Sequence, residues 1–467
     1  MCSCWRWVPL VLSVLRRPAY RNLFTAQVVA LLGTGLLTVA LGLLAFDLAG
    51  GQAGAVLGTA LTIKMIAYVF VAPVMAALVE RLPRKGVLVG ADLVRAAIAL
   101  SLPFIDQVWQ IYVLVFILQS ASATFTPAFQ ALIPVVLPGE KEYTKALSLS
   151  RLAYDLESLV SQLLAAALLA VMSFHNLFVG TMIGFLVSAA MVLATRLPAI
   201  PASHSQGSLL HRTTLGTRIF LREPSLRGLM ALNLVVATAT ALVLVNTVVY
   251  ARDLFGGSNT DVAIALAFYG VGSMMVAFLA PRVLERTPDR TFMLTGGWIL
   301  IAGLIAAAFL ASTEQSSIHL TDNSWAIFLG LWVLLGIGTS MISTPSSRLL
   351  RRVATDDTRS YLFTAQFSLS HACFLLAYPL AGWVGAAAGQ ETVALVLAAC
   401  ALIATIAAVV LWPATGPDGP QERVGPRARI GSTLPVAEAE GEGSVEAAHG
   451  GSADEAKPAR RNTERGQ

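Results

Sequence analysis

A long apolar stretch, residues 143–172, carries polar and ionisable side chains whose spacing could support proton exchange. Arg151, Asp155 and Gln162 recur at helical spacing and therefore share one face of a helix. Because Arg151 and Asp155 are one turn apart, an internal ion pair is the simpler interpretation of Asp155. Glu157 has no opposite charge within its own turn. We therefore expect Glu157 to take up and release protons, with Asp155 as the second candidate.

The second half of the chain places different donor atoms at a similar depth. A Thr-Pro pair ends an apolar stretch in each half, and His371 and Cys373 follow the second pair at nearly the distance at which Glu157 follows the first. A carboxylate, an imidazole and a thiolate together suit a divalent ion such as nickel, cobalt or zinc. His371 and Cys373 point about 200° apart on a helix, so only one of them can face a shared site. A metal site of Glu157, His371 and Cys373 thus stands beside the simpler interpretation that His371 and Cys373 are packing residues.

A lysine, Lys64, lies within the apolar stretch 56–79, with Tyr68 one turn further on. An ammonium in a dry site needs a partner. Lys64 could pair with a carboxylate, attract an anion, repel a cation, or extend to the lipid headgroups. The sequence leaves these alternatives open.

The elements that carry these residues are apolar stretches long enough to cross a bilayer. The chain is 56% hydrophobic and 13% charged, with a mean hydropathy of +0.71, which excludes one soluble core with a polar surface. Lipid offers the backbone no hydrogen-bond partner, so these lengths must be helices. The twelve predicted spans are 23–48, 56–79, 87–104, 109–129, 143–172, 176–197, 229–250, 262–284, 292–311, 325–343, 361–388 and 392–412.

Lysine and arginine collect in alternate connections between these spans. The connections predicted to be cytoplasmic hold almost all of them, and the opposite connections hold only Arg252. The asymmetry follows the positive-inside rule, and it would be lost if the number of spans were odd. It predicts a multi-pass protein of a bacterial inner membrane with both termini in the cytoplasm.

A short charged turn occurs twice, which indicates a duplicated chain. Glu80-Arg81-x-Pro follows the second span, and Glu285-Arg286-x-Pro follows the eighth. Asp92 and Arg95, three residues apart, are expected to pair with each other or with the first turn. The predicted parts are a cytoplasmic lead-in (1–21), a six-helix bundle (22–197), a cytoplasmic linker (198–228), a second six-helix bundle (229–412) and a disordered cytoplasmic tail (413–467).

The first turn resembles a signature of the major facilitator superfamily. Residues 76–85, Ala-Ala-Leu-Val-Glu-Arg-Leu-Pro-Arg-Lys, are similar to the family's Gly-x-Leu-Ala-Asp-Arg-x-Gly-Arg-Arg/Lys pattern. The resemblance implies an all-α fold of two pseudo-symmetric six-helix bundles around one cavity, which opens to each side of the membrane in turn. It also implies a gating role for these residues: Glu80, Arg81, Arg84, Lys85, Asp92, Arg95, Glu285 and Arg286. Alternatively, the turn is only a solvated, basic connection.

Within that family the chain looks most like the efflux branch. The segments 150–158 and 367–373 resemble bacterial nickel-resistance permeases, and the chain as a whole is similar to siderophore and macrolide exporters. The resemblance also implies that spans one, four, seven and ten line the cavity. The substrate-path residues expected here are Lys64, Gln27, Thr34, Gln119, Asn246, His371 and Cys373.

These features predict a proton-coupled exporter of a toxic small solute. A divalent metal such as nickel is placed ahead of hydrophobic drugs or siderophores, and a non-transporting membrane sensor is the alternative of another class. The sequence has no nucleotide-binding loop and no hydrolase signature, so we expect neither an enzyme nor a cofactor. The expected partners are the lipid bilayer, a solute and protons, with no nucleic acid, and the protein is expected to be a monomer.

Overall fold

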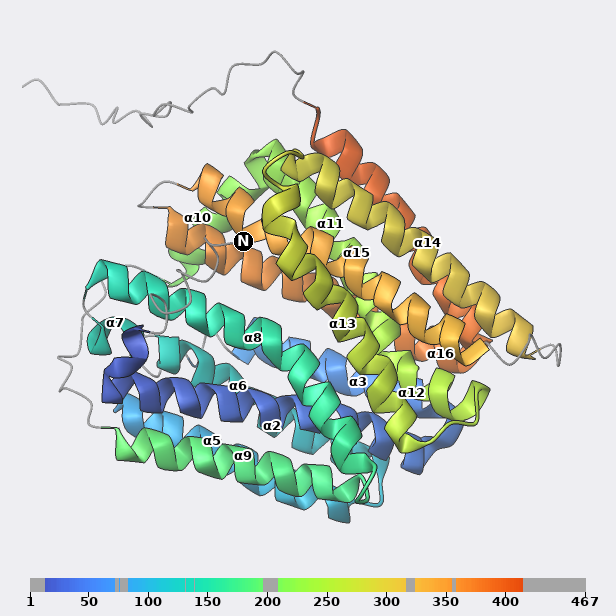
Figure 1. The fold of residues 1–467 in the computed structure, drawn as a ribbon, viewed down its shortest axis with the longest axis horizontal. Coiled ribbons are helices and arrows are strands. Elements are labelled where there is room, and N and C mark those ends of the chain that lie inside the picture. The colour runs from blue at the N-terminus through green and yellow to red at the C-terminus, as the bar shows by residue number, and fades with distance from the viewer. Residues whose placement is uncertain are drawn as a thin grey trace, which may run out of the picture. The chain divides into compact units, whose positions relative to one another are not determined.

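The computed structural model describes residues 13–71, 75, 83–130, 132–137, 139–195, 209–315, 324–354 and 358–414. These residues are helical and contain no β-strand (Figure 1). They belong to one compact unit, Met1–Ala414. The predicted disordered tail lies outside the described residues.

The first half of the chain supplies six spans. The first two are α2 (Pro18–Ala49) and α3 (Ala53–Ile66), the latter continued by the π-helix η3 (Ala67–Val71). The next four are α5 (Arg84–Ser101), α6 (Val108–Gln130), α8 (Glu140–Leu169) and α9 (His175–Ala194). Short helices join them: η1 (Ser13–Arg16), η2 (Gly50–Gln52), η4 (Leu102–Phe104) and α7 (Ile133–Val136).

The second half supplies six more spans. The helix α10 (Leu209–Arg222) leads into a seventh span built from α11 (Pro224–Ala241), η5 (Leu242–Asn246), α12 (Thr247–Val249) and η6 (Tyr250–Leu254). The following helices are α13 (Asn259–Val283), α14 (Asp289–Gln315), α15 (Ser324–Val353) and α16 (Arg359–Leu411). Within α16, Gly389 takes a φ of 85°, which favours glycine, so the chain reverses there and α16 holds two spans.

The helix lengths agree with twelve crossings. Among the described residues, nine stretches are long and apolar enough to span a membrane, and two of these, Pro18–Val71 and Ala365–Leu411, each contain two spans. The twelfth crossing is α8, whose polar residues leave only Val160–Leu169 apolar. The predicted all-α fold with twelve transmembrane helices is confirmed.

The outer surface of the bundle is apolar, as lipid contact requires. Phe104, Phe278 and Phe309 are 81%, 69% and 66% exposed. In water, so many exposed aromatic and aliphatic side chains would drive aggregation. Lipid surrounds these faces instead, because the bilayer interior is the solvent they match.

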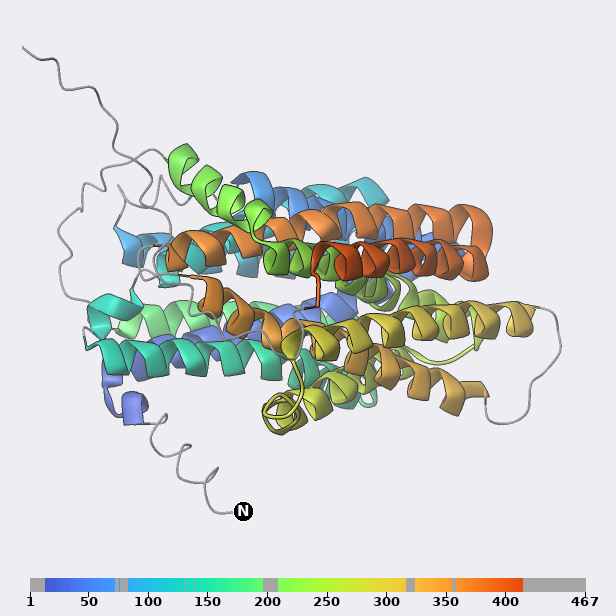
Figure 2. The same ribbon diagram turned by 90° about the horizontal axis from the view of Figure 1, so that it is seen from above.

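One contact occurs in both halves and supports the predicted duplication. Lys85, the second residue of α5, donates to the carbonyls of Leu193 and Thr195 at the end of α9, at 2.7 and 2.9 Å. Arg290, the second residue of α14, donates to Trp412 O at 2.6 Å, at the end of α16. The third span of each half therefore caps the sixth, where unpaired carbonyls favour a cation. Figures 1 and 2 show α14 (yellow) beside the last part of α16 (red).

The structure describes only part of the predicted gating motif. Glu80 and Arg81 lie outside the described residues, and so does the side chain of Arg84. Glu285 and Arg286 are exposed in the turn after α13. The gating role of the motif stays a prediction.

Among the described residues, the first half shares a hydrophobic core with the second half at the end predicted to face outward. That core joins the outer parts of α2, α3 and α6 to α11, α13 and α16. The inner end of the first half has a core of its own, formed by α2, α5, α6 and α8. Across the halves, Gln52 Nε2 donates to Ala386 O at 3.3 Å and Trp383 Nε1 to Thr59 Oγ1 at 3.0 Å. This conformation is therefore closed on the outer side.

Glycines make the outer closure possible. A Cβ on Gly58 of α3 would lie 2.7 Å from Tyr378 O and 2.9 Å from Gly382 Cα of α16. The backbones of α3 and α16 are therefore in contact, as small residues allow between membrane helices.

We expect Gly58→Ala to open this outer contact. Neither opposing atom is on a movable side chain, so the added methyl should cost the closed conformation about 1–3 kcal/mol. The measurement is the rate at which a maleimide added outside the cell labels a cysteine introduced at Thr38, in a chain whose native cysteines have been replaced. We expect labelling to become roughly 5–150-fold faster. Gly330→Ala is the control, because nothing lies within 4 Å of its Cβ position; equal rates in both variants would contradict the prediction.

Candidate functional site

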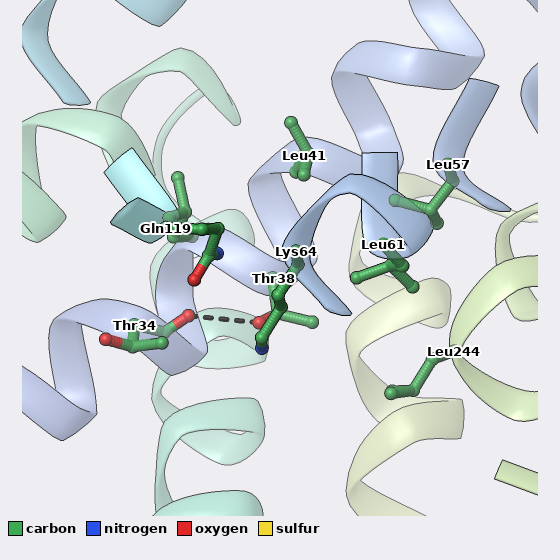
Figure 3. Close-up of a pocket in the computed structure, with 9 residues that line it drawn as sticks. Thr34, Thr38, Leu41, Leu57, Leu61, Lys64, Gln119 and Leu244 are labelled. Carbon is green, nitrogen blue, oxygen red and sulfur yellow. Dashed lines mark hydrogen bonds between the residues drawn. The ribbon is translucent and has the colours of Figure 1, made fainter. Parts of the chain in front are cut away.

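A small cavity lies where α2, α3 and α6 meet η5 of the second half, and Lys64 is its charged lining residue (Figure 3). Lys64 stands three residues before α3 widens into η3, and such π-segments are frequent at functional sites. Four polar and five apolar residues line the cavity: Thr34, Thr38, Lys64 and Gln119, with Leu37, Leu41, Leu57, Leu61 and Leu244.

The cavity in this conformation is too small for a drug-sized solute. It leaves about 20 Å³ for the centre of a water molecule, which is room for one water. Drug-sized pockets have volumes of about 300–1,000 Å³. A larger solute needs the helices to separate before it can bind here.

The threonine hydroxyls that line the cavity donate hydrogen bonds within α2 but can still accept them. Thr34 Oγ1 donates to Ala30 O and Thr38 Oγ1 to Thr34 O, both at 3.0 Å, within α2 (Figure 3). Each hydroxyl oxygen still has lone pairs that can accept a hydrogen bond. The lining thus combines an ammonium, acceptor oxygens and a leucine-rich wall.

Glu157 reaches the same turn of α2 at Gly35. Its Oε1 atom lies 2.8 Å from the position that a Cβ on Gly35 would take. Ser161, one turn along α8, also packs against Gly35, and its hydroxyl donates to Glu157 O at 2.5 Å. Because position 35 lacks a side chain, α8 approaches α2 closely enough to place the carboxylate beside the turn that holds Thr34 and Thr38.

Lys64 of α3 and Glu157 of α8 both approach the part of α2 that holds Thr34 and Gly35. Their opposite charges attract each other there, although the two side chains do not form a direct ion pair. A charge inside the membrane is stable only with such a partner. Pairing with a carboxylate was one of the alternatives that the sequence left open for Lys64.

His371 contacts the first half of the chain through Tyr68. Its Nδ1 lies 2.7 Å from Phe367 O one turn earlier on α16, so Nδ1 is the nitrogen that donates. The ring lies 4.1 Å from the Phe367 ring and 5.5 Å from the Tyr68 ring of η3. A tyrosine of the first half, one turn after Lys64, and an imidazole of the second half thus meet where the halves touch.

The proposed metal ligands are not assembled. Cys373 is 4% exposed and belongs to the hydrophobic core. Across the residues the structure describes, no three histidine, cysteine, aspartate or glutamate side chains come close enough to hold a metal ion. Glu157, His371 and Cys373 do not converge in this conformation, and a metal site formed by them stays a prediction. The reason is the helical rotation between positions 371 and 373, which turns the thiol away from the cavity.

Two other expected substrate-path residues hold helices together instead. Gln27 is buried, and its Oε1 accepts a hydrogen bond from Ser150 Oγ at 3.0 Å, which joins α2 to α8. Asn246 is fully buried in η5, and its Nδ2 donates to Ala381 O of α16 at 3.3 Å. Thr34, Gln119 and Lys64 do line the cavity. The side chain of Asp155 lies outside the described residues, so its role stays a prediction.

Asp92 and Arg95 pair with each other, which is one of the two arrangements expected from the sequence; the other was pairing with the first charged turn. Arg95 is hydrogen-bonded to Asp92, and Ser188 of α9 donates to the second carboxylate oxygen at 2.7 Å. The guanidinium lies 4.4 Å from the ring centres of both Phe125 and Phe185. This buried ion pair ties α5 to α6 and α9.

The sequence interpretation missed the corresponding charges of the second half. Asp289 begins α14 and forms ion pairs with Arg352 at 2.7 Å and with Arg348 at 3.5 Å, both on α15. The available signal was the spacing of Arg348 and Arg352, which are one helical turn apart.

Comparison with known proteins identifies a matching family and several similar proteins. The family model described as Major Facilitator Superfamily matches residues 23–321 and 255–439. Macrolide efflux protein A of Enterococcus faecalis is 28% identical over 31% of this chain and 47% of its own length. Macrolide efflux protein A of Streptococcus pyogenes is 26% identical over 39% of this chain and 45% of its own length. The chain thus spans about half the length of these relatives. The uncharacterized MFS-type transporter YfiS of Bacillus subtilis is 23% identical over 79% of this chain and 90% of its own length.

Solved structures share the fold at low sequence identity. The nucleoside transporter NupG has a TM-score of 0.66 and 15% identity, covering 85% of this chain and all of its own. A second similar structure is a bacterial homolog of the human lysosomal transporter Spinster, in an inward-facing and unoccupied conformation. It has a TM-score of 0.63 and 14% identity, and the match covers 84% of this chain and 94% of its own. These likenesses concern the fold alone.

Proposed function

This chain belongs to the major facilitator superfamily, and we propose that it exports a small amphipathic organic solute in exchange for protons. Membership makes it a multi-pass membrane transporter, a class that is not enzymatic. The direction, the kind of solute and the coupling to protons are the proposed parts, together with a bacterial inner-membrane location and cytoplasmic termini.

The observation that carries the proposal is the cavity lining. A leucine wall suits an apolar body, while Thr34, Thr38 and Gln119 can hydrogen-bond a few polar groups. Glu157, which packs against Gly35 on the same turn of α2, supplies a carboxylate that can gain and lose a proton. Export is supported by two relatives named as macrolide efflux proteins.

An organic solute now takes precedence over a divalent metal. Metal transport would be favoured by converging ligands, and the described residues offer none around Glu157, His371 and Cys373. A partly apolar lining whose charged group is an ammonium offers no ligand set for metal cations, which are recognised by charge and coordination geometry. It can bind organic molecules through their surface area.

In the proposed cycle, the outer contact of α3 with α16 separates when the inner ends close. The shared core of the outer ends and the separate inner core of the first half support this motion, because the described residues of the first half join the second half at the outer contact. The solute enters from the cytoplasm and leaves outside, while a proton returns by way of Glu157.

The test is accumulation in cells that lack their own major exporters. Cells making this protein should retain less of a labelled macrolide than cells making the Glu157→Gln variant, and a protonophore should abolish the difference. Nickel accumulation measured in the same cells provides the comparison. Lower nickel accumulation with unchanged macrolide accumulation would show that the substrate is a metal and not an organic solute. Unchanged accumulation of both would contradict the proposal of export.

A further inference from the structure

We propose that α10 and the first turn of α11 form a binding surface for anionic phospholipid on the predicted inner face of the membrane. The surface is separate from the transport cavity, so it does not depend on the proposed function. In Figure 2, α10 (light green) lies at the same end of the bundle as the start of α2 (dark blue).

Helix α10 has one buried face and one exposed face. Gly216 and Phe220, one turn apart, are buried, and α10 packs against α16. Positions 218 and 222 lie about 200° around the helix from position 220, and both carry exposed arginines. Leu221, three residues after Arg218, is on the exposed side and is 53% exposed. Two guanidinium groups beside an apolar side chain are typical of a helix at a lipid surface.

The arginines of this surface have no carboxylate partner. Among the residues that the structure describes, neither Arg218 nor Arg222 forms an ion pair or a side-chain hydrogen bond. The neighbouring Glu223 accepts a hydrogen bond from Ser225 Oγ at 3.3 Å instead. Arg227 is half-buried, and its Nε is buried without a hydrogen-bond partner. Since a buried donor without an acceptor is costly, we expect an acceptor from outside the chain to satisfy it.

Arg227 lies where three spans meet at their inner ends. A Cβ on the next residue, Gly228, would lie 2.6 Å from Trp412 Cβ, so the end of α16 packs directly on the first turn of α11. Arg290 of α14 donates to Trp412 O at 2.6 Å. Tryptophan is enriched at the boundary between membrane and water, so Trp412 indicates the depth of the headgroups. The first turn of α11 is therefore at the level of the lipid phosphates.

Charge complementarity identifies the occupant as an anionic phospholipid. Three arginines within residues 218–227 favour an anion, and guanidinium groups bind phosphate oxygens in pairs. Arginines immediately cytoplasmic of a span are the pattern that attracts anionic lipid. Soluble phosphate would neutralise the arginines but leave Leu221 in water, whereas a lipid covers both. The surface also borders α11, a span that the bilayer already surrounds.

The experiment measures phosphatidylglycerol bound to delipidated full-length protein by native mass spectrometry, over a titration with the lipid. Phosphatidylcholine, which has no net charge, is the comparison lipid. We expect Arg218→Gln with Arg222→Gln to weaken phosphatidylglycerol binding roughly 30-fold, and Arg227→Gln to weaken it roughly fivefold. Binding of phosphatidylcholine should not change. Equal affinity of the unmodified protein for the two lipids would overturn the proposal.

The double variant Arg16→Gln with Arg21→Gln is the matched control. Both arginines are exposed at the inner end of the first half, at the start of α2, so the same charge is removed on the same side of the membrane. We expect this variant to bind phosphatidylglycerol as the unmodified protein does. Equal losses in the two double variants would show only general attraction by positive charge and would overturn the proposed surface.

A second measurement tests whether the lipid covers the exposed face of α10. Leu221→Cys, in a chain without its native cysteines, is labelled by a water-soluble maleimide in nanodiscs of phosphatidylcholine with or without phosphatidylglycerol. We expect labelling to be at least roughly fivefold slower with phosphatidylglycerol, and unaffected by inorganic phosphate. Protection by phosphate alone would assign a soluble anion to the surface. Protection seen in cells but not in phosphatidylglycerol nanodiscs would assign a protein partner, and either result would overturn the proposal.

Discussion

Replacing Glu157 with glutamine is expected to abolish proton-coupled export, lowering its rate at least about 100-fold, with the amount of protein in the membrane unchanged. The amide keeps the size of the side chain beside Gly35. It cannot take up and release a proton as a carboxylate can, so the coupling to protons is lost. The measurement is solute-driven proton movement in inverted membrane vesicles.

Glu142→Gln is the matched control, because Glu142 lies on the same helix α8 and pairs with Arg17 at 3.0 Å near the surface, where both side chains are partly exposed. An exposed pair of this kind contributes little. We expect Glu142→Gln to transport normally. Normal exchange by Glu157→Gln would exclude Glu157 from the coupling mechanism.

Asp92→Asn is expected to destabilise the first half of the protein by about 3–5 kcal/mol, because it removes the carboxylate that the buried Arg95 guanidinium faces. Asp92 is 0% exposed and Arg95 is 4% exposed. Water cannot replace the lost carboxylate there. The measurement is the fraction of monodisperse protein after heating in detergent.

The double variant Asp92→Asn with Arg95→Met supplies the control. Methionine removes the charge and still fills the space between Phe125 and Phe185. We expect it to restore most of the lost stability, as apolar replacements of buried ion pairs often do. If the double variant were no more stable than Asp92→Asn, the defect would come from the amide itself and not from the buried guanidinium.

The membrane fold was predictable because its determinants are local. Lipid requires every backbone group to bond within its own helix, so apolar length alone indicates a span. The least apolar span is α8, where only Val160–Leu169 is apolar, and the helical spacing of its polar residues indicates that they share one face. The predicted break between spans 361–388 and 392–412 contains Gly389, where the chain reverses with a positive φ.

The partners of the polar residues were less predictable. Spacing correctly placed Asp92 with Arg95, since both lie on one helix one turn apart. It could not show that Lys64 and Glu157 approach the same part of α2, because these residues come from α3 and α8. The position of Glu157 depends on how closely α8 approaches α2, which the missing side chain of Gly35 permits.

The sequence by itself determined that this protein is a duplicated set of membrane helices with proton-exchanging candidates in its fifth span, because helix length and helical period are local properties. Only the tertiary structure decided which candidates meet. It turned Cys373 into the core, used Gln27 and Asn246 to join helices, and left Lys64 in the cavity. The physical reason is that helix rotation and crossing distance are fixed by packing against neighbouring helices, which no single span encodes.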